Sequence, residues 1–177
     1  MRQSMVFILV LLFGLMSRAI AVAKECSAKA LPPVAQRLLE KRLPDWRIVM
    51  VSDLSSDDQK LWAENYEDKC PGVVEGNFAT PRSFAVTLIR QEKAVLVQTL
   101  VLVESVQDRY VLRTLSAASQ TAAPNVLLKF PPGTYRDAEQ TRSVQTKLDG
   151  VAYIKLEAAG TLYYKTPQGF KSLEISE

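Results

Sequence analysis

The sequence predicts an α+β fold in which two short N-terminal helices are followed by an antiparallel β-meander, all in a single domain. Two segments with helical spacing of apolar residues lie before residue 70. From residue 73 onward, alternating segments rich in β-branched and aromatic residues are separated by turn residues. No shift in composition marks a second domain, and roughly 150 residues suit one core. The predicted division is therefore 1–23 and 24–177.

The first 23 residues have the pattern of a secretory signal peptide. Arg2 precedes an apolar run over residues 5–16, and small residues follow as far as Ala23. Cleavage would leave a mature chain that starts at Val22 or Lys24. The apolar run is about half the ~20 residues that a membrane-spanning helix needs. We therefore expect a periplasmic or secreted protein with no transmembrane segment in its mature form.

The first helix is predicted over residues 34–43. Prolines flank this segment at both ends, which is typical of a helix boundary. Val34, Leu38 and Leu39 share one helical face and are expected to point inward. Residues 46–51 then alternate between the two sides of an extended chain and predict a strand.

The second helix is predicted over residues 57–66. Ser56 and Gln59 have the spacing of a capping box, and Cys70-Pro71-Gly72 follows the end of the helix. The residues expected to pack inward are Leu61, Trp62 and Tyr66.

Cys26 and Cys70 are the only two cysteines. Export places them where thiols oxidise, so a disulfide bond between them is expected. Closing a loop of about 45 residues would stabilise the fold by roughly 3–4 kcal/mol in the chain-entropy model. The alternative is a reactive thiol at Cys70.

The rest of the chain is predicted to form nine strands. Asp149-Gly150 is the strongest hairpin signal, because both residues tolerate positive φ. Turns are also expected at 158–160 and 167–169, and a mobile loop at 116–125. The long apolar strand 94–104 should be central in its sheet. The predicted strands are 73–78, 84–90, 94–104, 109–115, 126–130, 144–148, 151–156, 161–165 and 170–175.

Composition excludes several classes of chemistry. The chain has no histidine, which removes Ser-His-Asp and Cys-His catalysis and histidine-bearing zinc sites. Without Arg2 and Arg18, the 22 basic residues become 20 against 19 acidic ones, so the net charge falls from +3 to +1. No basic block suggests nucleic acid as a partner. We predict no catalytic residues, no cofactor and no metal ion.

One segment resembles a known repeat. Residues 72–86, with Gly-Asn-Phe followed by Pro-Arg-Ser-Phe-Ala-Val, resemble the blade signature of FG-GAP or VCBS-type proteins. In that family, aspartates around the turn commonly bind calcium. Here Asn77, Ala79 and Ser83 stand at the acidic positions, and the pattern occurs once. The resemblance implies a single strand-turn-strand unit.

The wider layout resembles uncharacterised exported bacterial proteins, and this resemblance implies export and a similar fold without an activity. The residues that carry it are Trp46, Asp53-Leu54, Leu61-Trp62, Cys70-Pro71-Gly72, residues 132–137 and Tyr163-Tyr164.

Two turn regions are candidate binding surfaces. Aromatic and arginine side chains beside turns are favoured interface anchors. An alternative for the first region is a purely structural turn, with Tyr135 under the sheet and Asp137 accepting from backbone donors. The candidate residues are Tyr135, Arg136 and Asp137 in the first region and Tyr163, Tyr164, Lys165, Phe170 and Lys171 in the second.

These observations favour an exported, non-enzymatic envelope protein that binds another macromolecule, as an interaction module or an inhibitor or immunity-type module. The expected partner is an envelope protein or a cell-wall component. The alternative is a carboxylate-based hydrolase acting on envelope glycans or peptides, with Asp57 and Glu64 as a possible pair. A third hypothesis is a small-ligand carrier with an apolar cavity in its sheet.

Overall fold

The computed structural model describes residues 30–67 and 69–176. Strands make up 51% of the described residues and helices 17%, so the fold is mostly antiparallel β-sheet. The predicted layout of two N-terminal helices before one meander is wrong. The second helix lies between strands, because Arg47–Ile48 (β1) already pairs with a later strand before that helix begins. The two helices, of ten and eleven residues, pack in different hydrophobic clusters and so do not form one layer.

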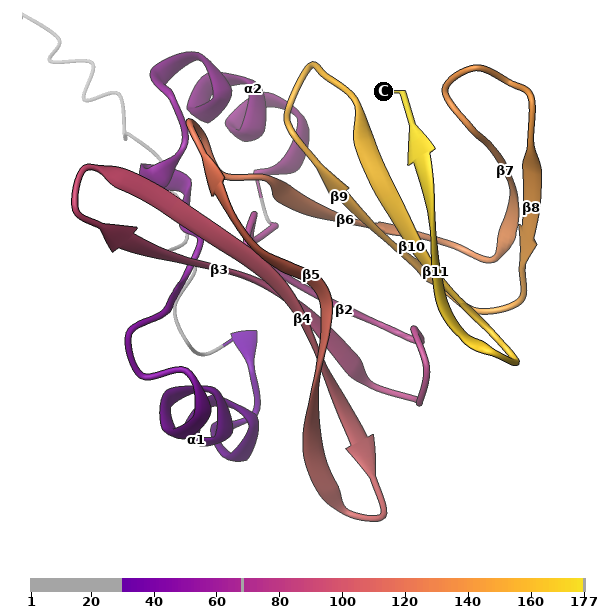
Figure 1. Cartoon of the computed structure of the whole chain (residues 1–177), viewed down its shortest axis with the longest axis horizontal. Helices are drawn as coiled ribbons and strands as arrows, with labels where there is room; N and C mark the ends of the chain where they lie inside the picture. Colours follow the sequence, from indigo (N-terminus) through magenta and orange to yellow (C-terminus); the bar gives the residue numbers. More distant parts are fainter. Residues whose placement is uncertain (1–29, 68, 177) are drawn as a thin grey trace, which may run out of the picture.

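The elements follow one another as shown in Figure 1. Their bounds are α1 (Pro33–Arg42), β1 (Arg47–Ile48), the 3₁₀ turn η2 (Val51–Asp53), α2 (Ser56–Tyr66), β2 (Val73–Gly76), β3 (Ser83–Glu92), β4 (Val95–Val106), β5 (Arg109–Thr121), β6 (Val126–Phe130), β7 (Gly133–Arg136), β8 (Ser143–Thr146), β9 (Gly150–Ile154), β10 (Gly160–Thr166) and β11 (Gly169–Ile175).

The strands form two main sheets and a separate hairpin. In the first sheet, β4 lies between β3 and β5, while β1 and β2 pair with successive parts of β3. The second sheet has the order β11-β10-β9-β6, and β7 pairs with β8 alone. The chain is therefore not one meander, because it leaves the first sheet after β5 and inserts the β7–β8 hairpin between β6 and β9.

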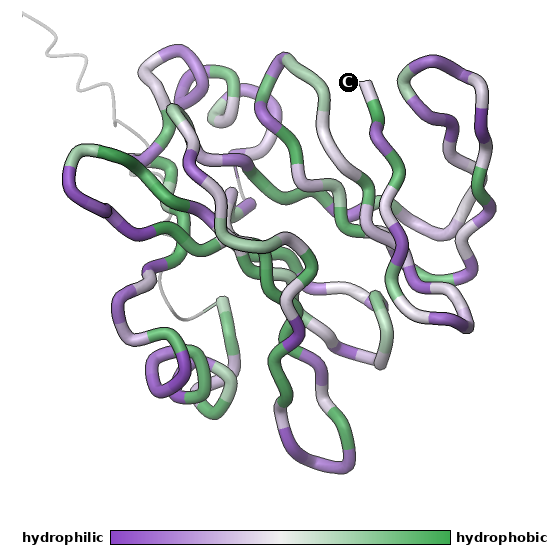
Figure 2. The backbone as a smooth tube through the Cα atoms, viewed as in Figure 1, coloured by the Kyte–Doolittle hydropathy of each residue, from purple (hydrophilic) through white to green (hydrophobic). Residues whose placement is uncertain are grey.

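Three hydrophobic clusters hold these layers together. One lies between α1 and the first sheet, a second joins the two sheets through Leu100, Leu102 and Leu127, and a third joins α2 to the second sheet around Trp62 and Leu162. In Figure 2 hydrophobic residues follow β3 and β4 through the middle of the molecule, whereas the loop joining β7 to β8 is mostly hydrophilic. The prediction that the long apolar strand is central is confirmed, since β4 has a partner on each side.

The inward face of α1 differs from the predicted one. Ala35 and Leu39 are the buried residues of this helix, whereas Val34 is 54% exposed and Leu38 is half-buried. Of the three residues expected to point inward, only Leu39 does so fully. Residues four apart lie on one helical face, so the helix rests on a narrow stripe and leaves Leu38 at its side.

The predicted second helix is confirmed with its start moved by one residue. Ser55, not Ser56, caps α2, with its hydroxyl accepting from the Asp58 N–H at 3.1 Å. Trp62 is fully buried and donates from its indole N–H to the Lys69 carbonyl at 3.1 Å, while Leu61 and Tyr66 pack beside it.

Several strand predictions need correction. Residues 116–121 belong to β5 and not to a loop, and β7 forms where only a turn was expected. The predicted Asp149-Gly150 hairpin is absent among the described strands, because β8 pairs with β7 and Gly150 instead begins β9 opposite Phe130. The turns near 158–160 and 167–169 are confirmed, as they join β9 to β10 and β10 to β11.

Two predictions fall partly or wholly on residues without a description. Cys70 follows α2, half-buried against the cluster beneath α1, but Cys26 lies outside the described residues, so the disulfide stays a prediction. The signal peptide at 1–23 also lies outside them. Within 30–67 and 69–176, no helix has the length and apolar character needed to cross a membrane.

Candidate functional site

A groove of about 680 Å³ lies between the C-terminal half of α1 and strands β4 and β5. Its lining is mostly apolar and aromatic. Val101 on β4 is buried and forms part of the floor, while Leu38 and Leu112 are half-buried at the sides. We call this surface the α1–β5 groove, and the residues that define it are Leu38, Leu43, Trp46, Val101, Tyr110 and Leu112.

The groove exists because α1 contacts the sheet through few side chains. Ala35 and Leu39 enter the core, and the small alanine lets the helix approach β3 and β4 closely. Leu38 lies on the side of α1 that borders β5, and its side chain does not fill the space between the helix and this strand. A helix with a wider apolar face on the sheet would close this space.

Trp46 is held in place at one side of the groove. The guanidinium of Arg90 lies 4.6 Å from the centroid of the Trp46 ring, and Arg90 also forms an ion pair with Glu92. A cation stacked on an indole face stabilises the orientation of that ring. The orientation of this groove residue is therefore fixed by a side chain of β3 that is not part of the groove lining.

A break in the register of β5 forms one end of the groove. The pairing of β4 with β5 shifts on either side of Leu100, so extra residues are accommodated on β5. Ala117 and Ala118 lie at this irregularity and both line the groove. The Thr99 hydroxyl donates to the Ser116 carbonyl at 2.7 Å. Such bulges bend a strand and disrupt its ladder locally, and here the pairing resumes at Ser119.

The outer edge of β5 is open. β5 is the last strand of its sheet, and no described strand pairs with its other side. Before the irregularity, Arg109 to Thr114 pair in one continuous register with β4. An exposed edge of this kind presents backbone N–H and C=O groups that can receive another strand. Tyr110 and Leu112, which face the groove, come from this same regular stretch.

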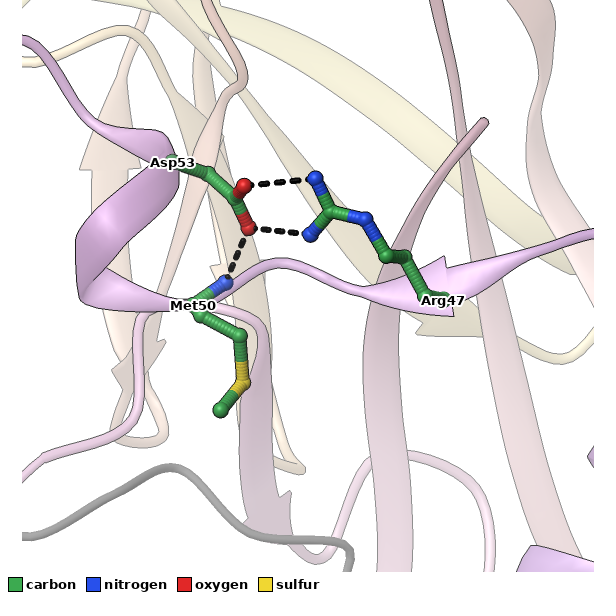
Figure 3. A network of polar contacts seen from close by, with 3 residues as sticks. All are labelled: Arg47, Met50 and Asp53. Carbon is green, nitrogen blue, oxygen red and sulfur yellow. Dashed lines mark hydrogen bonds and ion pairs between the residues drawn. The ribbon is translucent and has the colours of Figure 1, made fainter. Parts of the chain in front are cut away.

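A polar network lies where β1 leads into η2, and Figure 3 shows its three residues. The Arg47 guanidinium contacts both oxygens of the Asp53 carboxylate at 2.6 Å, and the Met50 N–H donates to one of them at 2.8 Å. Burial alone would raise the pKa of Asp53, but the hydrogen bonds from Arg47 and Met50 outweigh it and lower that pKa. All these contacts are internal to the turn, so the network holds β1 and η2 together.

The first predicted binding turn is largely engaged within the protein. Tyr135 is half-buried, its ring lies 5.3 Å from that of Phe130, and its hydroxyl donates to the Pro131 carbonyl. Asp137 accepts from the Arg142 N–H at 3.0 Å and from the Thr141 hydroxyl at 2.8 Å. These hydrogen bonds, chiefly the one from the Arg142 backbone, lower the pKa of Asp137. The contacts match the structural alternative for this turn.

Arg136 is exposed at the end of β7, where it pairs across the hairpin with Ser143. It is the residue of the first predicted surface whose side chain is most accessible. No contact within 30–67 and 69–176 assigns it a structural role, so its place in a binding surface stays a prediction.

The second predicted surface is divided between the two faces of its sheet. Tyr164 is buried in the cluster beneath α2, whereas Tyr163 is half-buried on the opposite face. The Lys165 ammonium lies 5.3 Å from the centroid of the Phe170 ring, and Lys171 is exposed beside them. Lys165, Phe170 and Lys171 thus remain accessible, while Tyr164 serves the core.

The predicted carboxylate pair lies on the outer surface of α2. Asp57 and Glu64 are both exposed on α2, and Asp57 forms an ion pair with Lys60 at 3.2 Å. Glu104 is buried, but Arg113 meets it at 3.1 Å. Among the described residues, no group of three or more His, Cys, Asp or Glu could hold a metal ion. Hydrolysis by two carboxylates needs two such groups free to act across a cleft. Glu75 and Asp149 do line one open hollow of about 430 Å³, but Glu75 pairs with Arg82 at 3.6 Å and Asp149 accepts from the Asn77 N–H at 2.8 Å.

The segment that resembles a calcium-binding repeat forms the strand-turn-strand unit β2–β3. Its turn is held by the Ser83 hydroxyl, which accepts from the Phe78 N–H at 3.1 Å and donates to the Thr80 carbonyl at 2.8 Å. The Asn77 N–H donates to the Asp149 carboxylate at 2.8 Å. The polar atoms near the expected ligand positions therefore stabilise the turn.

Sequence reasoning missed the α1–β5 groove. Leu38 and Leu43 were assigned to a helix and its end, and Trp46 and residues 109–115 to ordinary strands. One signal was available: Arg109 to Leu115 is followed by Ser-Ala-Ala-Ser, a run of small residues that cannot fill a core. No protein-family model, curated protein or solved structure matches this chain, so the groove is interpreted from its own geometry.

Proposed function

We propose that this chain is an exported, non-enzymatic envelope protein that binds another protein by receiving an extended segment along β5. The observation that carries this proposal is the open edge of β5 beside the α1–β5 groove. Edge pairing supplies affinity through backbone hydrogen bonds, and pockets for alternate side chains supply specificity. An interaction or inhibitor module needs no further chemistry.

The arrangement of charged groups supports binding over catalysis. Among the described acids, Asp53 and Glu104 are paired with an arginine across a short distance, and half-buried Asp58 and Asp149 accept hydrogen bonds from Ser55 and Asn77. Perturbed titratable groups that converge in a cleft are the usual mark of an active site. The α1–β5 groove instead combines apolar side chains with unpaired backbone groups.

A photo-crosslinking experiment tests the proposal. A benzophenone amino acid replaces Tyr110 in the groove or, as a matched control, Phe170 on the sequence-predicted surface; both residues are half-buried aromatics. Irradiation of exporting cells should give an adduct with a second envelope protein from position 110 and none from position 170. An adduct from position 170 alone would assign binding to the β10–β11 surface, and the absence of adducts from both would overturn the proposal.

A second pair of variants separates binding from folding. Leu38→Glu should abolish the adduct formed from position 110, because Leu38 lines the groove. Val34→Glu is the matched control, since Val34 lies on the same helix with 54% of its surface exposed. Thermal unfolding of each variant shows whether the fold persists. Equal adduct yields from the two variants would contradict the assignment.

A further inference from the structure

We infer that the segment received by β5 is acidic and places a carboxylate against Arg42. This inference rests on the proposed function and specifies the chemistry of the partner. Its starting point is the composition of the α1–β5 groove, in which Arg42 is the one charged residue of the lining. The rest of that lining is apolar, aromatic or hydroxyl-bearing.

The positive charge of Arg42 is not neutralised by the fold. Within 30–67 and 69–176, no carboxylate lies within ion-pair distance of Arg42. The same holds for Arg37 and Lys41, which are exposed on α1, and for Arg109 at the start of β5. Cations therefore lie along both the helix and the strand that border the groove.

Other arginines nearby show the contrast. Arg47 has both of its terminal nitrogens on Asp53, and Arg113 donates to Glu104 at 3.1 Å. Those two cations are committed to internal partners, whereas Arg42 is not. Complementary charges across an interface select the partner and orient it, so an unpaired arginine in an apolar groove favours a carboxylate.

The position of Arg42 at a helix end accounts for only part of this pattern. Lys41 and Arg42 lie in the last turn of α1, where cations interact favourably with the helix dipole. Any cation in the last turn gives this interaction with the dipole. The dipole does not explain why Arg42 lines the groove, and it is the position of Arg42 in the groove that indicates a ligand.

The strand geometry defines the shape of the acidic segment. Regular pairing on β5 covers Arg109 to Thr114, which limits the added strand to about six residues before the irregularity at Ala117. Successive side chains of a strand point to opposite faces. Every second residue of the added strand would therefore face the groove, with small or medium apolar side chains near Tyr110 and the carboxylate near the end of α1.

Selection from a displayed library of random twelve-residue peptides tests this inference. The full mature chain is panned in three forms: wild type, Arg42→Glu, and the matched control Arg37→Glu, which changes charge on the same helix outside the groove lining. The wild type and Arg37→Glu should enrich peptides with alternating apolar residues and at least one Asp or Glu. Arg42→Glu should bind those peptides at least tenfold more weakly.

N-methylation of the best peptide then tests the backbone pairing. Two versions of the peptide are made, one methylated on its odd-numbered amides and one on its even-numbered amides. One version should lose binding and the other should keep it nearly intact, because only one edge of the added strand faces β5. Equal loss of binding by the two methylated peptides would overturn the edge-pairing geometry.

Three outcomes would overturn the acidic partner. They are enrichment of neutral or basic peptides by the wild type, the same affinity for Arg42→Glu as for Arg37→Glu, and no enrichment at all. A separate binding experiment uses vesicles that contain phosphatidylglycerol. If the protein binds these vesicles through Arg42 and binds no peptide, the groove is assigned to an anionic lipid surface. In each case an adduct from position 110 would leave the proposed function standing, whereas its absence would remove both.

Discussion

Leu38 and Leu39 are adjacent in the sequence, yet the structure gives them different roles, and replacing each by alanine tests that division. Leu39 is 6% exposed and packs in the cluster between α1 and the first sheet. Removing a buried leucine side chain to the β-carbon costs about 2–5 kcal/mol, depending on how far the cavity collapses. α1 buries only two of its own residues, so little can rearrange to fill the space, and we expect about 3 kcal/mol for Leu39→Ala.

Leu38→Ala should cost no more than about 1 kcal/mol, because half-buried Leu38 faces the open groove and its removal leaves no closed cavity. Urea unfolding followed by tryptophan fluorescence gives both values, with buried Trp62 as the probe. Adducts from position 110 should be lost in Leu38→Ala and retained in Leu39→Ala as long as that variant is folded. Similar unfolding free energies for the two variants would refute the assignment of the inward face, and with it the origin of the groove.

Two further predictions concern the turns that support the first sheet. Gly72→Ala should destabilise the fold by about 2 kcal/mol or more, since a β-carbon there would lie 2.8 Å from the Val49 backbone nitrogen, which cannot move aside. Gly133→Ala is the control, with its nearest contact at 3.5 Å, and chemical denaturation should find it within about 0.5 kcal/mol of wild type. The lowered pKa of Asp53 means that its contact with Arg47 stabilises the fold above the ordinary carboxylate range and loses this effect as the pH falls through the lowered pKa. The stability difference between wild type and Asp53→Asn should thus be full at pH 7 and shrink toward pH 3; a difference that is constant or grows on acidification would contradict the role of the contact.

Local chemistry predicted most of the individual elements. The flanking prolines and helical spacing located α1 to within a residue, and a short apolar run after Pro124-Asn125 located β6 with both of its ends. Turn residues placed the last two hairpins correctly. In each of these cases, the signal and the structure it specifies lie within the same few residues.

Predictions failed for segments whose pairing partner lies far away in the sequence. Asp149-Gly150 has ideal turn chemistry, yet Gly150 pairs with Phe130 on β6 and no hairpin forms. The small residues of β5 resemble a loop, but they remain extended because β4 supplies a ladder of backbone partners. The backbone hydrogen bonds gained by pairing with a neighbouring strand outweigh the local preference of these residues for a turn or loop.

The candidate site shows the same division. Aromatic and basic residues beside turns pointed to Tyr135 and Tyr164, but Tyr135 packs on Phe130 and Tyr164 lies in the core. Composition alone excludes histidine chemistry, because no folding can supply an absent side chain. The α1–β5 groove could not be found in this way. It depends on which narrow stripe of α1 meets the sheet and on β5 being the last strand, and both are set by long-range packing that no short stretch of sequence encodes.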